Sequence, residues 1–223
     1  MKRALLSATL IFAANQGAAW AEDRFERVAV YLEQTAEDED AEVIFEAVSG
    51  TAGLSALKVT APDGRTVIDF KAANSKLGIR HLLLESPEPK NDGKLLADFP
   101  KGAYVFSGTL TTGAALQGEA MLSHKFPDTV RVIQPRPDDR RVPSSGMQIK
   151  WNAAKDAAGY IVVIEQEKTG REIKANLASN ATSFTVADGF LSPGLDYKLA
   201  VGTVAKDGNK SFTEFGFATA AKK

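Results

Sequence analysis

The sequence contains no cysteine, and it has only two histidines and two tryptophans among its 223 residues. A chain without cysteine forms no disulfide, no thiolate metal site, no cysteine nucleophile and no lipid anchor through cysteine. An excess of charge of one sign is also missing, since Lys plus Arg number 27 and Asp plus Glu number 28. This balance argues against a nucleic-acid partner, because phosphate binding requires a basic face.

Long apolar runs are absent as well. No stretch after the N-terminal region approaches the roughly 20 apolar residues that a membrane helix needs, so we predict no membrane span. Hydrophobic residues nevertheless make up 44% of the chain and charged residues 25%, which is typical of a folded globular protein. Stability must come from burial of a core, which about 100 residues per domain can supply. The length allows one domain or two.

Residues 1–21 have the three regions of a secretory signal peptide. Lys2 and Arg3 form a positive start, a mostly apolar run follows over 4–14, and Ala19-Trp20-Ala21 fits the small-residue cleavage rule. We predict cleavage after Ala21. The short, alanine-rich form is typical of bacteria, so we expect the mature protein in the periplasm or in the medium, without choosing between them. A buried N-terminal helix is the alternative interpretation.

Strand patterns recur through the C-terminal half. Residues 135–146 are rich in proline, serine and charge, which predicts a loop or a boundary. Asp207-Gly208 predicts a hairpin turn, with a last strand over 212–217. Between these segments apolar and polar residues alternate at the spacing of a β-sandwich. The apolar members are Met147, Ile149 and Trp151, then Tyr160, Val162 and Ile164, then Ile173 and Ala175, then Phe184 and Val186, and then Tyr197, Leu199 and Val201.

Three features of this half resemble a fibronectin type III domain over about residues 129–221. They are Trp151 on the second strand, Tyr160 opening the third, and Leu191-Ser-Pro-Gly-Leu-Asp-Tyr197. The last segment is similar to a tyrosine corner, in which the phenol bonds back to nearby backbone. The resemblance implies that Trp151 fills the space between two sheets. Some domains of this family bind integrins through Arg-Gly-Asp in the last hairpin; here that hairpin reads Lys206-Asp207-Gly208-Asn209, so that activity is not carried over.

The N-terminal half repeats the same pattern over 43–127. Val43, Phe45 and Ala47 alternate, Leu57 and Val59 lead into a turn at 61–64, and Val67, Ile68 and Phe70 form the next strand. Ile79 to Glu85 is another expected strand, in which Leu82-Leu83-Leu84 predicts burial on both faces. Phe99-Pro100-Lys101-Gly102-Ala103-Tyr104 is an approximate repeat of the C-terminal corner motif. Arg24 to Gln34 fits a helix and a strand equally well.

The N-terminal half also resembles a family of uncharacterised secreted bacterial proteins that carry a C-terminal fibronectin-type domain. The residues that carry this resemblance are Val30–Asp40, Leu84–Pro89, Phe99–Gly108 and Leu122–Pro127. The resemblance implies no established activity. Members of the family tend to have Asp-Gly-Asp where this chain has Asp38-Glu39-Asp40, and losing the glycine makes a tight ion-binding loop harder to form.

The acidic run over 37–42 holds the metal candidates of the chain, Asp38 and Asp40. Calcium takes six to eight oxygen ligands, and clustered carboxylates supply several of them. The spacing does not match the twelve-residue calcium loop, which needs a glycine at its sixth position. A solvated, self-repelling loop is therefore favoured, and we predict no metal and no cofactor.

No catalytic constellation is visible. His81 and His124 have no companion at metal-ligand spacing, so a packed or surface imidazole is favoured for each. Ser55-Ala-Leu-Lys58 matches Ser-x-x-Lys, but the segment is predicted to be a strand, where the two side chains point to opposite faces. Glu85 and Glu88 could be paired carboxylates of a glycosidase, yet the prolines around them predict a rigid exposed turn. We therefore assign no catalytic residue.

Two glycosylation sequons occur, Asn180-Ala-Thr182 and Asn209-Lys-Ser211. Such sequons mark surface loops when the protein is glycosylated. In a bacterial protein we expect no role for either of them.

These observations predict an all-β protein made of two tandem immunoglobulin-like β-sandwiches, the second fibronectin type III-like. The expected divisions are a signal peptide over 1–21, a first domain over 22–128 and a second over 129–223. The function we predict is a non-enzymatic, exported binding protein whose partner is another protein or an envelope component. One alternative is a carbohydrate or envelope-polymer binder, which would need a surface row of aromatics such as Tyr31 and Tyr104. The other is a hydrolase using carboxylates of the N-terminal half.

Overall fold

The computed structural model describes residues 24–36, 40–89, 92–166 and 168–222. The predicted signal peptide lies outside these residues. Strands dominate the described part, and its single helix, α1 (Asp92–Asp98), has seven residues. No helix in these ranges is long and apolar enough to cross a membrane.

Seven strands of the first half form two sheets. Their bounds are β1 (Arg27–Thr35), β2 (Asp40–Val48), β3 (Leu54–Thr60), β4 (Thr66–Lys71), β5 (His81–Glu85), β6 (Gly102–Leu110) and β7 (Ala115–Leu122). One sheet has the order β1-β2-β5 and the other β4-β3-β6-β7. Alternation puts Val43, Phe45 and Ala47 of β2 into the core between the sheets.

The second half repeats this arrangement strand for strand. Its strands are β8 (Val132–Gln134), β9 (Gln148–Trp151), β10 (Gly159–Gln166), β11 (Arg171–Ala178), β12 (Ser183–Thr185), β13 (Asp196–Val204) and β14 (Lys210–Ala218). They pair in the orders β8-β9-β12 and β11-β10-β13-β14, which match those of the first half when each strand number is raised by seven. The expected internal repeat is therefore confirmed at the level of topology.

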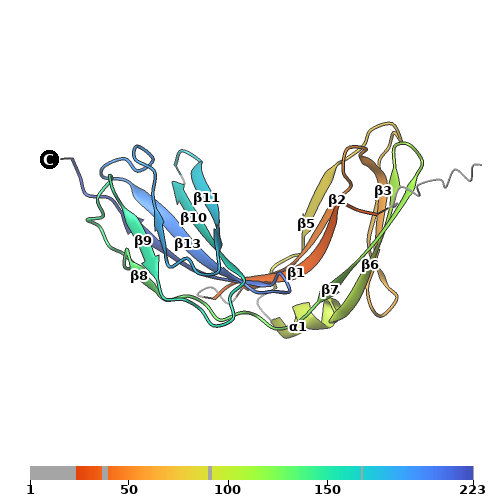
Figure 1. The fold of residues 1–223 in the computed structure, drawn as a ribbon, viewed down its shortest axis with the longest axis horizontal. Helices are drawn as coiled ribbons and strands as arrows, with labels where there is room; N and C mark the ends of the chain where they lie inside the picture. Colours follow the sequence, from red (N-terminus) through yellow and green to blue (C-terminus); the bar gives the residue numbers. More distant parts are fainter. Residues whose placement is uncertain (1–23, 37–39, 90–91, 167, 223) are drawn as a thin grey trace, which may run out of the picture.

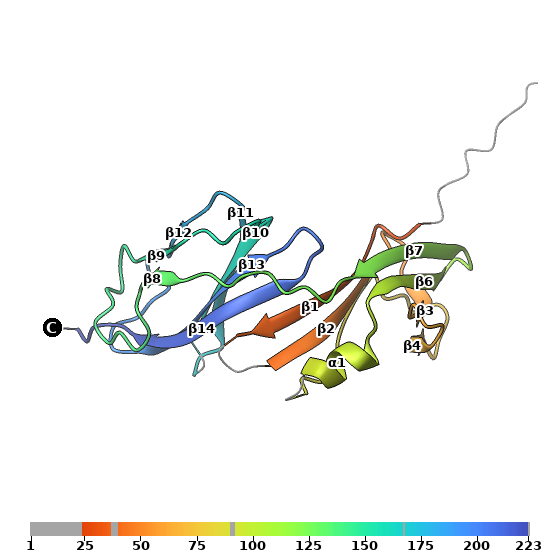
Figure 2. The ribbon, with the colours of Figure 1, turned by 90° about the horizontal axis from the view of Figure 1, so that it is seen from below.

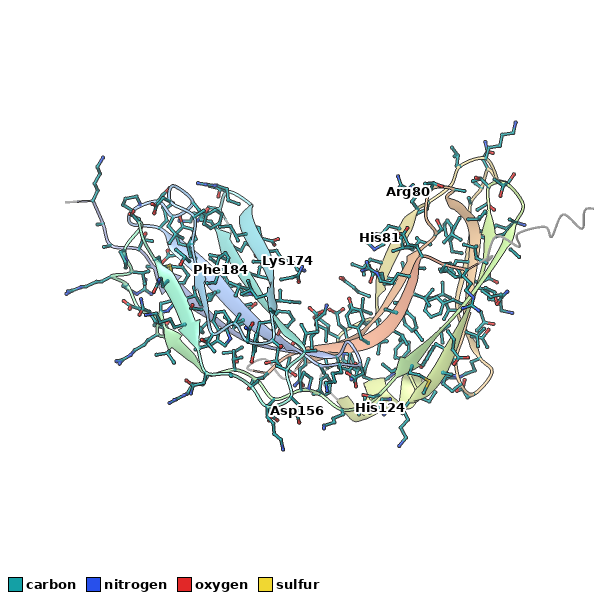
Figure 3. The ribbon with its side chains drawn as sticks, in the orientation of Figure 1. Arg80, His81, His124, Asp156, Lys174 and Phe184 are labelled. Atoms are coloured by element: carbon teal, nitrogen blue, oxygen red, sulfur yellow. The ribbon has the colours of Figure 1, made fainter. Side chains whose placement is uncertain are left out.

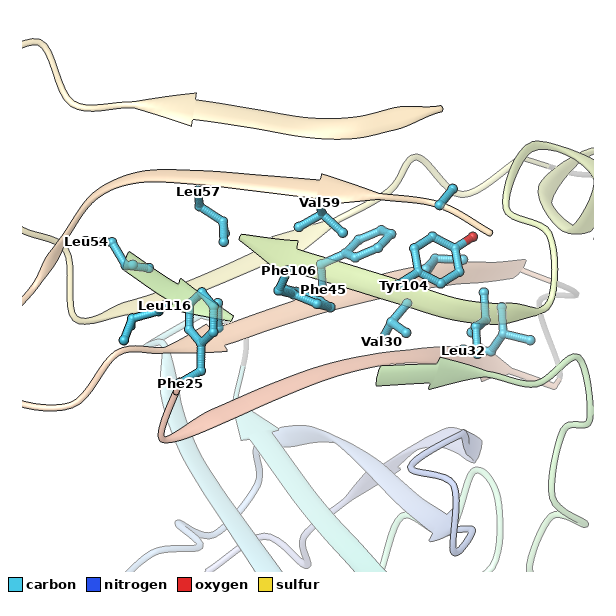
Figure 4. Packing of buried hydrophobic residues seen from close by; sticks show 14 of the residues in the cluster. Phe25, Val30, Leu32, Phe45, Leu54, Leu57, Val59, Tyr104, Phe106 and Leu116 are labelled. Carbon is cyan, nitrogen blue, oxygen red and sulfur yellow. The ribbon is translucent and has the colours of Figure 1, made fainter. Parts of the chain in front are cut away.

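Each half has its own hydrophobic core. The first core gathers aromatic and aliphatic side chains from both of its sheets, among them Phe45, Tyr104 and Phe106 (Figure 4). In the second core Trp151 is buried and packs against Tyr160, with ring centroids 5.6 Å apart. The position of Trp151 between the sheets confirms the prediction from its place on the second strand.

A buried tyrosine closes the same corner of each sandwich. The Tyr197 hydroxyl at the start of β13 accepts a hydrogen bond from the Ser192 amide at 2.8 Å. In the equivalent strand β6, the Tyr104 hydroxyl donates to the Pro100 carbonyl at 3.0 Å. Burial, followed by the nearby Asp63 carboxylate, raises the pKa of Tyr104 to about 12. The predicted tyrosine corner is thus present twice, with the direction of the hydrogen bond reversed.

The two sandwiches share one sheet. The end of β1 pairs in parallel with the start of β14, in the register Glu33 to Lys210 and Thr35 to Phe212. This pairing joins both halves into a seven-stranded sheet with the order β11-β10-β13-β14-β1-β2-β5. The molecule is bent at the junction (Figure 1), where β1 and β14 lie side by side (Figure 2). The seven-stranded sheet lines the inside of the bend and the smaller sheets lie outside (Figure 1).

Three expectations about local structure are resolved. Arg24–Gln34 is strand rather than helix over most of its length, because β1 pairs with β2 along nine residues. The expectation that Leu82–Leu84 is buried on both faces is wrong: Leu83 is 49% and Leu84 37% exposed, because β5 is the last strand of its sheet. The proline-rich segment 135–146 is a loop inside the second sandwich rather than a boundary, since its Val142 is buried in the second core.

Helix α1 was not predicted from the sequence. It connects β5 to β6 and packs Leu95 into the first core. On its exposed side Lys94 and Asp98 form an ion pair at 2.5 Å. The helix lies on the outside of the bend (Figure 1) and next to β2 (Figure 2).

Candidate interaction surface

A buried asparagine holds the junction between the sandwiches. Asn209 follows the turn of the β13–β14 hairpin and is 1% exposed. Its side-chain oxygen accepts the amide hydrogen of Leu32 in β1 at 2.8 Å. Its side-chain nitrogen donates to the carbonyls of Ser123 and Lys125, in the segment between β7 and β8, at 3.2 and 3.0 Å. A single side chain therefore binds the first sandwich, the connecting segment and the second sandwich together.

The hairpin that presents Asn209 is fixed by its turn and by the connecting segment. Gly208 has a φ of 92°, a conformation that glycine adopts without strain. The Asp207 carboxylate accepts a hydrogen bond from the Ser123 hydroxyl at 2.6 Å. Gln34 of β1 donates to the buried Ser211 hydroxyl at 2.8 Å, and the Ala36 amide donates to the Phe212 carbonyl at 3.0 Å.

An ion pair covers the junction on the inside of the bend. Lys210 contacts Glu33 at 2.8 Å and lies over the ring of Tyr31, 4.2 Å from its centroid. Burial alone would lower the pKa of the Lys210 ammonium, but the Glu33 carboxylate and Tyr31 outweigh it, so this pKa is raised. Lys210 stays charged over the physiological range, and the junction keeps its ion pair.

The side of the seven-stranded sheet that faces away from both cores is called the inner face here. On its second-half portion Phe212 packs with Ile161 and Ala200 in a small apolar cluster. A Cβ at Gly202 would lie 2.5 Å from the Phe212 ring, so the ring rests directly on the strand backbone. The inner face is therefore closely packed beside the junction.

Carboxylates gather on the first-half portion of the inner face. Glu42 of β2 lies opposite Glu33 in the β1–β2 ladder. Burial and then the charges of Glu85, Glu33, Glu88 and Asp40 raise the pKa of Glu42 to about 7. This part of the face is therefore acidic, and Glu42 exchanges a proton near neutral pH.

The residues singled out in the sequence are dispersed. His81 of β5 lies 2.8 Å from Glu46 through its Nε2 atom and is exposed on the inside of the bend. His124 lies on the outside, where its Nε2 atom is 2.8 Å from the Phe99 carbonyl oxygen (Figure 3). Two imidazoles on opposite sides of the molecule do not form one site.

The metal and carboxylate candidates do not form a chelating group either. Asp38 lies outside the described residues, and Asp40 begins β2, where its carboxylate accepts the Thr35 amide at 3.3 Å. Within the described ranges no three His, Asp or Glu side chains are arranged to hold a metal ion. Glu85 and Glu88 are exposed at and after the end of β5.

The Ser-x-x-Lys match is a strand, as expected. Ser55 and Lys58 both belong to β3, where alternation turns them to opposite faces. The Ser55 hydroxyl donates to the Thr109 carbonyl at 3.1 Å inside the sandwich, whereas Lys58 is exposed. The serine therefore completes backbone hydrogen bonding and has no contact with the lysine.

A hollow beside the junction opens on the outside of the bend. Residues 125–128, 155–156 and 205–207 line it, and Asp156 lies at this side of the molecule (Figure 3). Its lining residues include three lysines and three aspartates, so it carries no net charge that would select a charged ligand.

Known proteins that are similar to this chain were found by comparison of structures and not by comparison of sequences. The sequence matches no protein-family profile and no curated protein, so the resemblance of the N-terminal half to secreted bacterial proteins stays a prediction. Fibronectin(III)-like modules of Clostridium thermocellum CbhA cover 88% of this chain and 93% of theirs at 10% identity and a TM-score of 0.37. A two-domain fibronectin type III segment of chicken tenascin covers 88% of this chain and 100% of its own length, at 12% identity and a TM-score of 0.33.

A single fn3 domain of human collagen alpha-1(XX) covers 45% of this chain and 91% of its own length, at 17% identity and a TM-score of 0.33. The assignment of the fold rests on the repeated strand order and the paired tyrosine corners rather than on these scores. On that basis the chain is all-β, with immunoglobulin-like sandwiches of fibronectin type III-like form.

Proposed function

We propose that this chain is an exported, non-enzymatic binding protein that holds a macromolecular partner on the inner face of its bend. The proposal includes cleavage after Ala21 and a domain boundary between residues 128 and 129. A fold of this kind hosts many functions, so the surface of this chain, rather than its fold, supports the proposal. The partner we expect is another protein or a component of the cell envelope.

The observation that carries the proposal is the set of polar contacts that fixes the two sandwiches together at the junction. A simple tether between two domains needs only a flexible segment, and its domains would move independently. Here Asn209, Lys210 and Ser211 each contact the first sandwich or the connecting segment through hydrogen bonds or an ion pair. Fixing two sandwiches in one sheet organises a long surface before binding and so reduces the entropy lost on association.

The surface does not favour sugar recognition. That interpretation requires a row of exposed aromatic rings on one sheet. Among the described residues no Phe, Tyr or Trp side chain is exposed: Tyr104 is 0% exposed and Tyr31 is half-buried beneath Lys210. The inner face instead combines the apolar cluster around Phe212 with polar and acidic side chains, and protein interfaces likewise combine an apolar centre with a polar rim.

Site-directed photocrosslinking tests the proposal, because the natural chain has no cysteine to compete with an introduced one. Lys174 of β11 lies on the inside of the bend (Figure 3), and Lys150 of β9, which is also exposed, lies on the outer sheet. Lys174→Cys and Lys150→Cys would each carry a benzophenone and be mixed with periplasmic extract of the producing cells. We expect a discrete adduct from the Lys174→Cys protein that the Lys150→Cys protein does not give. Equal adducts from both, or none from either, would contradict the proposal.

A further inference from the structure

Exposed apolar side chains are concentrated in one short segment. Among the described residues seven large hydrophobic side chains are exposed, and four of them lie within residues 77–84. They are Leu77, Ile79, Leu83 and Leu84, with exposed fractions of 65%, 37%, 49% and 37%. Exposed apolar side chains grouped in one segment mark an interaction site more often than scattered single residues do.

This segment overlaps β5, which is one of the two edge strands of the seven-stranded sheet. Strand β5 has β2 as its single neighbour in the sheet. The Ser49 amide donates to the Arg80 carbonyl, and the Ser86 amide donates to the Val43 carbonyl, both at 3.0 Å. Along a strand, the N–H and C=O groups of successive residues point alternately to the two sides. The backbone groups of Leu82 and Leu84 therefore bond to β2. Those of His81, Leu83 and Glu85 point outward, away from the sheet.

The open edge has defined ends. On one side the amide and carbonyl of Ile79 are already paired with Leu54 of β3, at 3.0 and 2.9 Å. On the other side Pro87 has no amide hydrogen to offer. A strand that added to this edge would therefore pair along His81–Glu85 and no farther.

The sequence of the open edge is complementary to itself in the antiparallel direction. When two copies of His-Leu-Leu-Leu-Glu are aligned antiparallel about Leu83, each His81 lies opposite a Glu85 and each Leu82 opposite a Leu84. Leu83 then faces its own copy across a two-fold axis. The outward backbone groups of residues 81, 83 and 85 meet the same groups of the second strand, as the hydrogen-bonded pairs of an antiparallel ladder require.

The charges around the edge support the same alignment. Glu85 lies among the carboxylates that surround Glu42 and has no basic residue opposite it in β2, where its partner is Ile44. The imidazole of a second copy supplies an N–H donor at that place. At the other end His81 contacts Glu46 through Nε2, which leaves its second ring nitrogen available for the incoming Glu85.

We propose that two copies of this chain associate through β5, which joins their inner faces into one continuous sheet across a two-fold axis. The interface has a few backbone hydrogen bonds and the side chains of one short strand, so it belongs to the small, reversible class. The dimer is therefore expected to form in a concentration-dependent way.

Single-cysteine crosslinking tests the register. Paired Cα atoms in a hydrogen-bonded antiparallel pair are ~5.5 Å apart, within the range of a disulfide. Leu83→Cys is therefore expected to form a disulfide-linked dimer under mild oxidation. Two copies of His81 are offset by four residues, or ~13 Å, so His81→Cys alone should not crosslink. A mixture of His81→Cys and Glu85→Cys should crosslink, because these positions face each other.

The control is Met121→Cys, at a position that is 61% exposed and lies on β7. We expect the Leu83→Cys protein to crosslink at least tenfold faster than this control. Equal rates for the two, or His81→Cys crosslinking as fast as Leu83→Cys, would overturn the proposed register.

Sedimentation of the natural chain tests the dimer without any cysteine. For the natural chain we expect the average mass to rise with protein concentration. The Leu83→Lys protein should show no such rise, whereas the Met121→Lys protein should show the same rise as the natural chain. A natural chain that stays monomeric up to millimolar concentration overturns the dimer. The photocrosslink at Lys174 is on the other arm of the bend and should persist in Leu83→Lys. The proposed partner on the inner face and the proposed dimer through β5 can therefore be disproved independently of each other.

Discussion

Asn209 accepts a hydrogen bond from the Leu32 amide at 2.8 Å, although 177 residues separate them in the chain. The same side chain satisfies two carbonyls of the connecting segment. A polar group that is buried and fully paired specifies one arrangement, because every alternative leaves donors or acceptors without partners. This relationship makes the bend a property of the fold and yields the first prediction.

Asn209→Ala should lower the free energy of unfolding by about 1–3 kcal/mol, because it leaves buried backbone groups without partners. Urea unfolding measures this change, and small-angle scattering should show a wider distribution of bend angles. Asn180, in the other sequon, is exposed, so Asn180→Ala is the matched control and should change neither. Equal effects of the two substitutions would refute the role of Asn209.

Tyr197→Phe should destabilise the second sandwich by about 1 kcal/mol, since the Ser192 amide loses its acceptor while the packing of the ring is kept. Tyr104→Phe removes a donor from the Pro100 carbonyl at the equivalent corner of the first sandwich, and a loss of the same size is expected. Calorimetry of both variants checks these values. A neutral result for both would mean that water replaces each hydroxyl at no cost.

Stability should depend on pH through Glu42. The pKa of this carboxyl is raised from its ordinary value of 4.5 to about 7 in the folded state. Between these two values the folded chain holds more protons than the unfolded chain, so stability falls as the pH rises from 4.5 toward 7 and levels off above it. Thermal melting across this range measures the slope.

Glu42→Gln should flatten that slope and stabilise the protein above pH 7, by about 1 kcal/mol after allowance for solvent screening. The exposed Glu172 of β11 provides the control substitution Glu172→Gln, which should leave the slope intact. If Glu42→Gln melts with the same pH dependence as the natural chain, Glu42 is not the titrating group.

Calcium should leave the melting temperature unchanged. The Asp40 carboxylate already accepts the Thr35 amide, and the spacing of the acidic run 37–42 favours a solvated loop. Melting in millimolar calcium and in a chelator gives the comparison. A rise of several degrees with calcium alone would restore Asp38 and Asp40 as metal ligands.

Local alternation was enough to predict most of the fold. Trp151, the two corner tyrosines and the Asp207-Gly208 turn each depend on neighbours close in sequence or on a simple inside–outside rule. The pattern failed at Leu82–Leu84, where three consecutive leucines predict a central strand and the structure has an edge. Composition cannot distinguish burial in a core from exposure at an edge.

The junction lay beyond prediction for a different reason. Parallel pairing of β1 with β14 involves three register positions, and no periodicity states which of several edges will meet. The sequence marks Asn209 only as part of a sequon, although its place just after a hairpin turn is a signal for an asparagine that bonds to backbone. The acidic surroundings of Glu42 likewise arise from strands that are distant in sequence.

The pairing of β1 with β14 has a consequence for biogenesis. β1 is synthesised before β14, so β1 has no neighbour on that side until the residues between the two strands have also been made. Until then this edge of β1 is exposed and can pair with a non-native strand. Assembly of the bent molecule therefore requires β14, and loss of β14 would uncover the edge of β1 in the first sandwich as well as disrupt the second sandwich.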